Sequence, residues 1–361
     1  MPEQPSDTSR AWVEIDLGAL RRNGAAIARH AGVPLLPMVK ADAYGLGAVA
    51  VARALESLHP WGFGVATVDE GAALREAGIT RPILVFTPLL PADFPAARAA
   101  RLTPVLGDAS AIARWTESGD AWQLDIDTGM ARAGVRWDRI GDIAHLLARV
   151  PPEGACTHFH SATDSTSVAQ QRERFATALA ALPSRPRMLH AENGPTVEHL
   201  DAKSTMDVVR PGIFLYGVGS GHGARIAPEP VVNLHARVVE VREIDDGDVV
   251  SYDATWRAQG RRRIATLAIG YADGYRRALS NRGEVLLNGA RARVAGLVTM
   301  DMTMIDATGT RCEPGDVATL IGAAGSDSLS VADVAERAEL SPYEILTGLR
   351  ARLRRVYREA A

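Results

Sequence analysis

The strongest constraint on this fold is a regular alternation of short apolar runs and helical patterns between residues 34 and 209. The apolar runs have the length and composition of buried strands, and the segments between them carry a helical period. Strands that alternate with helices in this way predict parallel βα units. Eight such units predict a closed (β/α)8 barrel, and an open doubly wound sheet is the alternative. The eight runs are 34–39, 61–66, 82–87, 102–106, 121–126, 154–159, 186–190 and 206–209.

The sequence pattern changes after about residue 227. Pro228 and Pro230 indicate a linker, and β-branched runs separated by polar turns follow. Asn288-Gly289 is a typical hairpin turn. We therefore expect a mostly β domain, with helices only near 330–338 and 343–357, and we expect the early strand near residue 12 to join it. The expected organisation is a disordered tail at 1–10, a strand at 11–17, the barrel at 18–228 and the β domain at 229–361.

Composition excludes several classes of protein. Hydrophobic residues make up 47% of the chain and charged residues 23%, so a large core can form. The net charge of -3 and the absence of a long basic run give no sign of a nucleic-acid groove. Two cysteines, no signal-like N-terminus and no membrane-length apolar run predict a cytoplasmic protein that does not associate with membranes.

The first predicted barrel strand ends abruptly on Lys40. Burial against apolar side chains lowers the pKa of a lysine, which makes its amine available as a nucleophile or a base. The commonest use of such an amine is a Schiff base with pyridoxal phosphate. The plain alternative is a surface lysine at the end of a strand.

Other polar residues follow the later barrel strands, at the end where barrel enzymes have their active sites. Gly212 and Ile213, after the eighth strand, offer peptide N–H groups of the kind that hold a phosphate. His158 and His160 could bind zinc, but no further ligands occur at metal spacing, so we expect no metal. Asp42 is expected to cap the helix that follows it. The remaining strand-end residues are Tyr44, Asp125, Asp127, Arg132, Asn193, Gly194 and Arg210.

On these residues the chain resembles the barrel-type, pyridoxal phosphate-dependent alanine racemases over about nine tenths of its length. The resemblance implies a (β/α)8 barrel with a C-terminal β domain, and a head-to-tail homodimer with shared active sites. It also implies an isomerase that makes D-alanine for peptidoglycan. The matching motifs are Val39-Lys-Ala-Asp-Ala-Tyr-Gly45, Asp127-Thr-Gly-Met130, Thr157-His-Phe159, Arg210-Pro-Gly-Ile213, Ser251-Tyr252, Ile269-Gly-Tyr-Ala-Asp-Gly274 and Met300-Asp301.

The resemblance also implies a role for each residue. Lys40 would bind the cofactor and act as one catalytic base, while Tyr252 of the other subunit would act on the opposite face. Arg210 would hydrogen-bond the pyridine nitrogen and keep it unprotonated, because a guanidinium retains its proton. The other implied cofactor-binding residues are Tyr44, His158, Asn193, Gly194, Gly212, Ile213 and Tyr343. The implied substrate-binding residues are Arg132, Met300, Tyr271 and Asp301.

Four positions depart from the family pattern. Asp125 stands where the family often has a carbamylated lysine, and we expect its carboxylate to pair with Arg132. Gly194 replaces a serine that holds the phosphate, so Thr196 or a peptide N–H would substitute. Leu46 replaces a histidine and Asp253 a glycine. These departures leave open a racemase of serine or one of broad specificity.

Two rival functions differ in features that the sequence shows. Decarboxylases of similar plan would need an active-site cysteine in the β domain, whereas Cys312 lies in a turn before Pro314. Non-catalytic carriers of pyridoxal phosphate lack a β domain with a second base. Both rivals are therefore less favoured than a racemase.

Overall fold

The structure, a computed structural model, describes residues 9–359 of the chain. These residues form two compact units, which we call the barrel unit and the β unit. The barrel unit comprises Leu20–Ala43 and Ala48–Pro228; the β unit comprises the residues up to Ala19, Tyr44–Gly47, and those from Glu229 onward. Most of the expected N-terminal tail lies outside the described residues.

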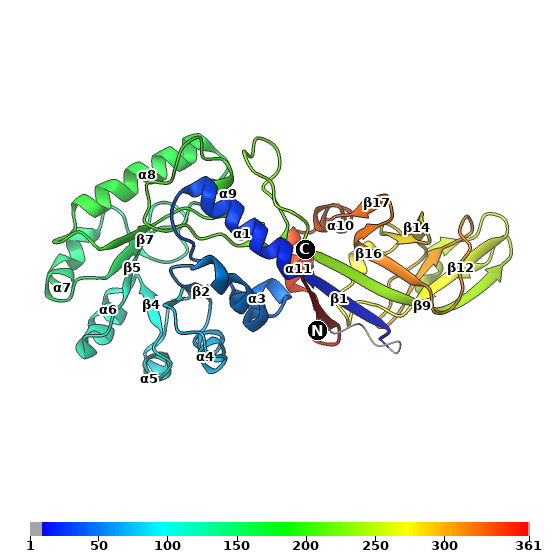
Figure 1. Cartoon of the computed structure of the whole chain (residues 1–361), viewed down its shortest axis with the longest axis horizontal. Coiled ribbons are helices and arrows are strands. Elements are labelled where there is room, and N and C mark those ends of the chain that lie inside the picture. The colour runs from blue at the N-terminus through cyan, green and yellow to red at the C-terminus, as the bar shows by residue number, and fades with distance from the viewer. Residues whose placement is uncertain (1–8, 360–361) are drawn as a thin grey trace. The chain divides into compact units, whose positions relative to one another are not determined.

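The barrel unit contains a ring of parallel strands (Figure 1). Parallel bridges Met38–Gly64, Leu35–Val209 and Asn193–Arg210 connect the first and eighth predicted runs to the regular strands. With these bridges, eight parallel segments form a closed ring. The prediction of a (β/α)8 barrel is therefore confirmed, and the alternative of an open sheet is wrong. In ring order the regular strands are β2 (Phe63–Val65), β3 (Ile83–Val85), β4 (Thr103–Leu106), β5 (Gln123–Asp127), β7 (Gly154–Cys156) and β8 (Met188–His190), with β6 (Val135–Arg136) paired to β5.

Helices lie outside these strands (Figure 1). Thr67, Asp108 and Asp164 each cap a helix by accepting hydrogen bonds from its first free N–H groups, which explains where those helices begin. The helices are α1 (Leu17–Ala31), α2 (Lys40–Gly45), α3 (Ala48–Leu55), α4 (Val68–Glu76), α5 (Phe94–Ala99), α6 (Ala109–Trp115), α7 (Ala144–Arg149), α8 (Ser165–Ala180) and α9 (Gly194–Glu198).

The barrel core is built from residues that its strands contribute in turn. Leu36, Leu84, Val105 and Met188 are among the buried side chains of one cluster, which also includes Cys156. Because side chains of several strands fill the interior, the barrel is a packed core that leaves chemistry to the ends of its strands.

The β unit is organised on one long strand, β9 (Val232–Ile244), which pairs with β1, β12 and β16. The order β9, β12, β15, β14, β13, β16 returns to β9, so these six strands close a second ring. Beside it, β1 (Ala11–Asp16) joins β9, as the sequence led us to expect. The other elements are β10 (Val249–Val250), β11 (Trp256–Arg257), β12 (Arg262–Leu267), β13 (Glu284–Leu287), β14 (Ala290–Val294), β15 (Thr303–Asp306), β16 (Val317–Ala324), β17 (Asp327–Leu329) and α10 (Val331–Ala338).

The Asn288-Gly289 turn joins β13 directly to β14. Asn288 has a φ of 48° and Gly289 a φ of 83°. Two successive positive φ values belong to the tight turn whose twist matches a hairpin, and asparagine and glycine adopt them most readily. The hairpin predicted here is confirmed.

The helix predicted at 343–357 is wrong over most of its length. The structure has a short helix, α11 (Pro342–Thr347), and then a strand, β18 (Arg354–Arg358). β18 runs parallel to β1, with Val13 opposite Arg355 and Ile15 opposite Tyr357. Pairing with a distant strand therefore overrides the local helical preference of this arginine-rich segment.

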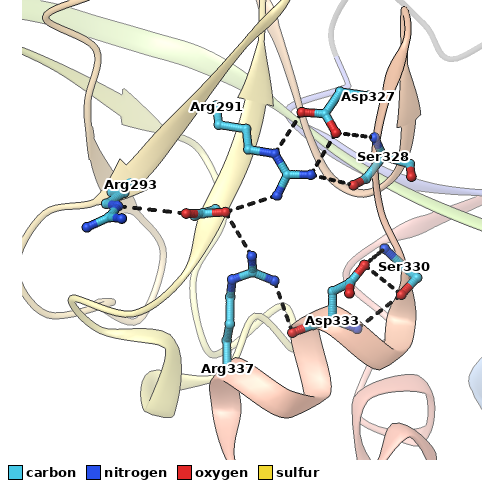
Figure 2. A network of polar contacts seen from close by, with 8 residues as sticks. Arg291, Arg293, Asp327, Ser328, Ser330, Asp333 and Arg337 are labelled. Carbon is cyan, nitrogen blue, oxygen red and sulfur yellow. Dashed lines mark hydrogen bonds and ion pairs between the residues drawn. The ribbon is translucent and has the colours of Figure 1, made fainter.

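An exposed network of charges ties the strands of the β unit to α10. Arg291 of β14 lies between Asp327 of β17 and Glu284 of β13, with nitrogen-to-oxygen distances of 2.6 and 3.1 Å (Figure 2). Arg337 of α10 reaches the same Glu284 oxygen at 2.8 Å. The network fixes the positions of neighbouring elements, but exposed ion pairs contribute little to stability.

Candidate active site

A cavity of about 310 Å³ opens at the carboxyl ends of the barrel strands. It brings together five of the predicted site residues, which come from four different strand ends. Phe86, Pro88 and Met130 supply apolar parts of its wall. The predicted residues in the lining are Lys40, Asp125, Arg132, His158 and Arg210.

Lys40 begins a turn with an unusual backbone. The residues Ala41–Tyr44 all have φ between 51° and 59°, so α2 is a left-handed turn made without glycine until Gly45. This conformation costs L-residues about 1–2 kcal/mol each and persists only where contacts hold it. One such contact is the hydrogen bond from Ala48 N to Asp42 Oδ1, 2.7 Å long. Asp42 thus caps α3, which confirms its predicted role.

The surroundings of Lys40 lower the pKa of its amine. Burial is the main cause, and the charges of Arg132 and Arg210 act in the same direction. The Glu70 carboxylate opposes them and raises the pKa. The direction agrees with the expectation for a lysine at an apolar strand end, and it favours the uncharged, reactive amine.

Arg210 is buried, at 3% exposed, and is held rigidly by hydrogen bonds. Nη1 donates to His190 Nδ1 at 2.6 Å and to His190 O at 2.7 Å; Nη2 donates to Thr157 O at 2.6 Å and to Ala191 O at 3.0 Å. Within residues 9–359 its Nε has no acceptor, although the residue lines the cavity. This leaves one N–H of a fixed cation available to a ligand.

His190 and Gln123 are functional residues that the sequence reasoning missed. His190 Nε2 lies 2.6 Å from Gln123 Oε1, and both residues are fully buried. Since Arg210 donates to Nδ1, Nε2 must carry the proton and donate to Gln123. Burial and Arg210 hold the pKa of His190 well below its usual value, so the ring stays neutral. A histidine ending the seventh predicted strand was the one available signal.

His158 is also neutral. Burial, together with the positive charges of Arg210, Arg132 and Lys40, lowers its pKa to about 3. Asn193 Nδ2 lies 3.4 Å from His158 Nε2. His158 can therefore accept a hydrogen bond or pack against a ligand, but it does not supply a positive charge at neutral pH.

The loops after the seventh and eighth strands form a small cradle. The N–H groups of Gly212 and Ile213 have no acceptor in the part of the chain that the structure describes. A Cβ placed on Gly194 would lie 3.8 Å from Gly212 N, so this glycine widens the cradle. The hydroxyl of Thr196 donates to Asn193 Oδ1 at 3.0 Å. Of the two expected substitutes for the missing serine, the peptide N–H groups are therefore the ones still free to donate.

The direct pairing expected between Asp125 and Arg132 is not formed; across residues 9–359 no hydrogen bond or ion pair joins them. Burial raises the pKa of Asp125, whereas the charges of Arg210 and Arg132 lower it. Cys156 Sγ donates a weak hydrogen bond to its Oδ1 at 3.8 Å. Asp125 and Arg132 therefore interact through their charges without a direct hydrogen bond.

The β unit holds Tyr252, which is 69% exposed. It lies in a kinked turn, where Ser251 has a φ of 67° and Asp253 a φ of 59°. Ser251 Oγ donates to Leu297 O at 2.7 Å and fixes the turn. The backbone at Tyr252 is thus firmly set while its phenol remains open to a ligand or a second chain.

Three further predicted residues of the β unit lie on two loops joined by backbone hydrogen bonds. Tyr271 N donates to Thr299 O, and Ala272 N donates to Met300 O, each at 3.0 Å. Asp301 pairs with Arg352 at 2.8 Å. The N–H of Met300 has no acceptor among the described residues, so it is free to bind an anion.

Tyr44 and Tyr343 lie side by side in the β unit, with ring centroids 5.8 Å apart. Tyr44 is 6% exposed and Tyr343 is 42% exposed. Burial raises the pKa of Tyr44, so its hydroxyl keeps its proton and can donate a hydrogen bond.

Within residues 9–359, no group of three or more histidine, cysteine, aspartate or glutamate side chains is arranged to hold a metal ion. No helix in that range combines the length and the apolarity that crossing a membrane requires.

Comparison with known families identifies the chain. The alanine racemase N-terminal domain matches residues 15–220, and the alanine racemase C-terminal domain matches residues 231–357. This chain belongs to the alanine racemase family. The resemblance inferred from the motifs is confirmed.

Individual family members resemble the chain over nearly its full length. Alanine racemase of Deinococcus radiodurans is 38% identical, over 96% of this chain and 98% of that protein. The crystal structure of alanine racemase from Bacillus anthracis with bound L-Ala-P has a TM-score of 0.91 at 31% identity and covers 99% of this chain and 96% of that one. That of Bartonella henselae alanine racemase with covalently bound pyridoxal phosphate has a TM-score of 0.89 at 29% identity, covering 97% and 99%.

Proposed function

We propose that this member of the alanine racemase family interconverts L- and D-alanine with pyridoxal phosphate, using Lys40 on one face of the substrate and Tyr252 of a second copy on the other. The observation that carries the proposal is the meeting of the Lys40 amine and the buried Arg210 in one cavity at the barrel end. That cavity belongs to a chain whose family is named for this reaction.

The residues present fit the cofactor. Lys40 offers an amine with a lowered pKa for its aldehyde, and Arg210 offers an N–H for its ring nitrogen. The N–H groups of Gly212 and Ile213 suit its phosphate, as backbone N–H groups at a barrel's eighth strand commonly do. Asn193, Gly194 and His158 would border it, and Tyr44 and Tyr343 are the further residues that we propose for binding its phosphate. When bound, pyridoxal phosphate withdraws electrons from the substrate's Cα–H bond, so that this proton becomes removable.

Two bases account for inversion of the substrate centre. One base removes the α-proton from one face, and the conjugate acid of the other delivers a proton to the opposite face. Lys40 Nζ would serve the first face and the Tyr252 hydroxyl the second, each as a general acid or base depending on direction. Arg132 and the N–H of Met300 would bind the substrate carboxylate, and Asp125 would orient Arg132 through its charge. Tyr271 and Asp301 would border the entrance.

The exposure of large side chains in the β unit supports the proposal that a second copy of the chain binds there. Tyr252, Met300 and Tyr271 are 69%, 54% and 40% exposed. Val239, Val249 and Met302, also largely exposed, line a further hollow of the same unit. Large apolar side chains gathered in this way mark an interaction surface. A head-to-tail homodimer would cover them and bring Tyr252 to the other copy's barrel.

The attachment site can be mapped unambiguously because the chain has only two lysines, Lys40 and Lys203. Lys203 Nζ donates to the backbone oxygens of Arg29 and His30, away from the cavity. Borohydride reduction of the loaded enzyme, followed by peptide mapping, is expected to place the cofactor on Lys40 in both wild type and Lys203→Ala. Attachment to Lys203, or to neither lysine, would contradict the proposal.

Sharing of sites between copies can be tested by mixing two inactive variants. Lys40→Ala and Tyr252→Phe subunits, unfolded together and refolded at equal amounts, form mixed dimers with one intact site each. Activity should recover to about one quarter of wild type if subunits pair at random. No recovery, with mixed dimers demonstrated by mass, would place Tyr252 in its own subunit's site.

Substrate and location complete the proposal. Racemisation of alanine is expected to exceed that of serine, and no carbon dioxide should be released; faster serine turnover would favour the alternative of a serine or broad-specificity racemase. Two free, buried thiols, Cys156 and Cys312, suit the reducing cytoplasm that we propose for the protein.

A further inference from the structure

Glu70 lies on α4, outside the set of residues assigned above, and its carboxylate makes contacts in two directions. Oε2 accepts hydrogen bonds from Ala66 N at 2.7 Å and Thr67 N at 3.4 Å. Oε1 accepts one from Ala41 N at 2.7 Å. Ala66 follows β2, and Ala41 is the residue directly after Lys40. One carboxylate therefore joins the ends of two neighbouring barrel strands.

The position of this bridge explains why a carboxylate is needed. The first strand pairs with the second through Val39 N to Gly64 O and Gly64 N to Pro37 O, each at 2.9 Å. In a parallel ladder the next two rungs would join Ala66 N to Val39 O and then Ala41 N to Ala66 O. The chain instead enters its left-handed turn at Ala41, where φ is 52°. The Glu70 carboxylate supplies an acceptor for the donor that the turn takes out of the ladder.

Helix capping by itself does not require this contact. In α10 the corresponding carboxylate, Asp333, accepts only from Ser330, the capping residue of its own helix. Glu70 makes the same local bonds at Thr67 and additionally reaches a residue 29 positions away. The extra bond ends on the peptide that follows the reactive lysine.

We propose that Glu70 is a positioning residue for Lys40: its two-sided hydrogen bonding fixes the start of the left-handed turn and thereby the direction of the lysine side chain. The proposal rests on the assignment of Lys40 as the cofactor-binding base. Electrostatics supports it. Lys40 faces the cations Arg132 and Arg210 and the neutral ring of His158, and Glu70 is the anion that raises its pKa against them.

The test compares Glu70→Ala with Thr67→Ala in the loaded, full-length enzyme. Both substitutions remove part of the cap of α4, but Thr67→Ala removes only the hydroxyl that accepts Glu70 N. Hydrogen exchange at the Ala41 amide should accelerate by at least about tenfold in Glu70→Ala and stay near wild type in Thr67→Ala. The kcat of Glu70→Ala should fall by about tenfold or more, with KM for alanine changed less than about twofold.

Glu70→Gln removes the charge of the Glu70 side chain while keeping nearly the same shape. It replaces Glu70→Ala in the test if that variant does not fold. Loss of the anion beside Lys40 should move the acidic limb of kcat to lower pH by about half a unit, because kcat reports the substrate complex, in which Lys40 acts as a base, and its protonated amine is destabilised there. An unmoved limb together with unchanged Ala41 exchange would overturn the proposal. So would equal effects of Glu70→Ala and Thr67→Ala, or faster Ala41 exchange with unchanged kcat.

Failure of the proposed function would give a different experimental result from failure of the Glu70 proposal. If the cofactor did not map to Lys40 in the wild type, that assignment would fall. The exchange measurement at Ala41 would still report whether Glu70 holds the turn.

Discussion

Around Arg210 in the barrel unit the candidate site is buried and hydrogen-bonded, whereas around Tyr252 in the β unit it stands exposed on a fixed backbone. Arg210 is 3% exposed and donates five hydrogen bonds, while Tyr252 is 69% exposed. The first arrangement is preorganised for a buried ligand. The second requires another surface to complete it, which is what the proposed homodimer provides. The contrast also orders the expected effects of mutation.

Lys40→Ala tests the barrel side most severely. Under the proposed assignment, removing the amine removes both the covalent attachment of the cofactor and one of the two bases. Activity should fall below about one ten-thousandth of wild type in both directions, and the cofactor's absorbance band should disappear. Lys203→Ala is the control and should retain both. Substantial activity in Lys40→Ala would assign the attachment to a different group.

The variant Tyr252→Phe tests the proposed catalytic base on the exposed surface of the β unit. We expect a loss of about 10²- to 10⁴-fold, with the cofactor still bound and a deuterium wash-in that differs between the two enantiomers. Because the phenol is exposed and the turn is fixed by Ser251, the unfolding midpoint should stay unchanged. Equal losses in both directions would argue against separate bases on the two faces.

The two regions also differ in how far sequence could predict them. The barrel followed from its period, since each apolar run is long enough to be recognised on its own. The helix expected at 343–357 failed because β18 exists only through its pairing with β1, more than 300 residues away. The polar residues at the strand ends could be identified from the sequence. The roles of His190, Gln123 and Glu70 could not, because they depend on which side chains come into contact in the folded chain. The left-handed turn at Ala41–Tyr44 could not be predicted, because Asp42 alone among its residues is of a type that favours positive φ.

The variant Arg210→Met tests how much the buried hydrogen-bond network around Arg210 contributes to the free energy of unfolding. The substitution leaves two backbone carbonyls, those of Thr157 and Ala191, without a donor among the described residues, whereas His190 O keeps its bond from Thr157 N. Each buried acceptor left unpaired costs about 1–3 kcal/mol, so the free energy of unfolding should drop by about 2 kcal/mol or more. Urea unfolding of the loaded enzyme measures this. A drop within experimental error would mean that the barrel end relaxes around the loss.

Acidification should destabilise the barrel unit through His158. Its pKa in the folded chain is lowered to about 3, below the value near 6.5 of an unfolded chain. Between these two values the unfolded state binds the extra proton, so stability falls as pH falls. From pH 6.5 to 5.5 the contribution is about 1 kcal/mol. His158→Gln should reduce the slope of unfolding free energy against pH in this window, and an unchanged slope would contradict the neutral assignment.

The smallest effect is expected for Arg291→Ala in the exposed network of the β unit. Arg291 makes nearly as many polar contacts as Arg210, including bonds to Asp327 and Glu284 (Figure 2). Its partners, however, can be rehydrated when it is removed, whereas the carbonyls around Arg210 cannot. The unfolding midpoint should therefore hardly move, and added salt should reduce the difference from wild type still further. A loss comparable to that of Arg210→Met would show that the number of contacts, and not burial, decides what an arginine contributes in this protein.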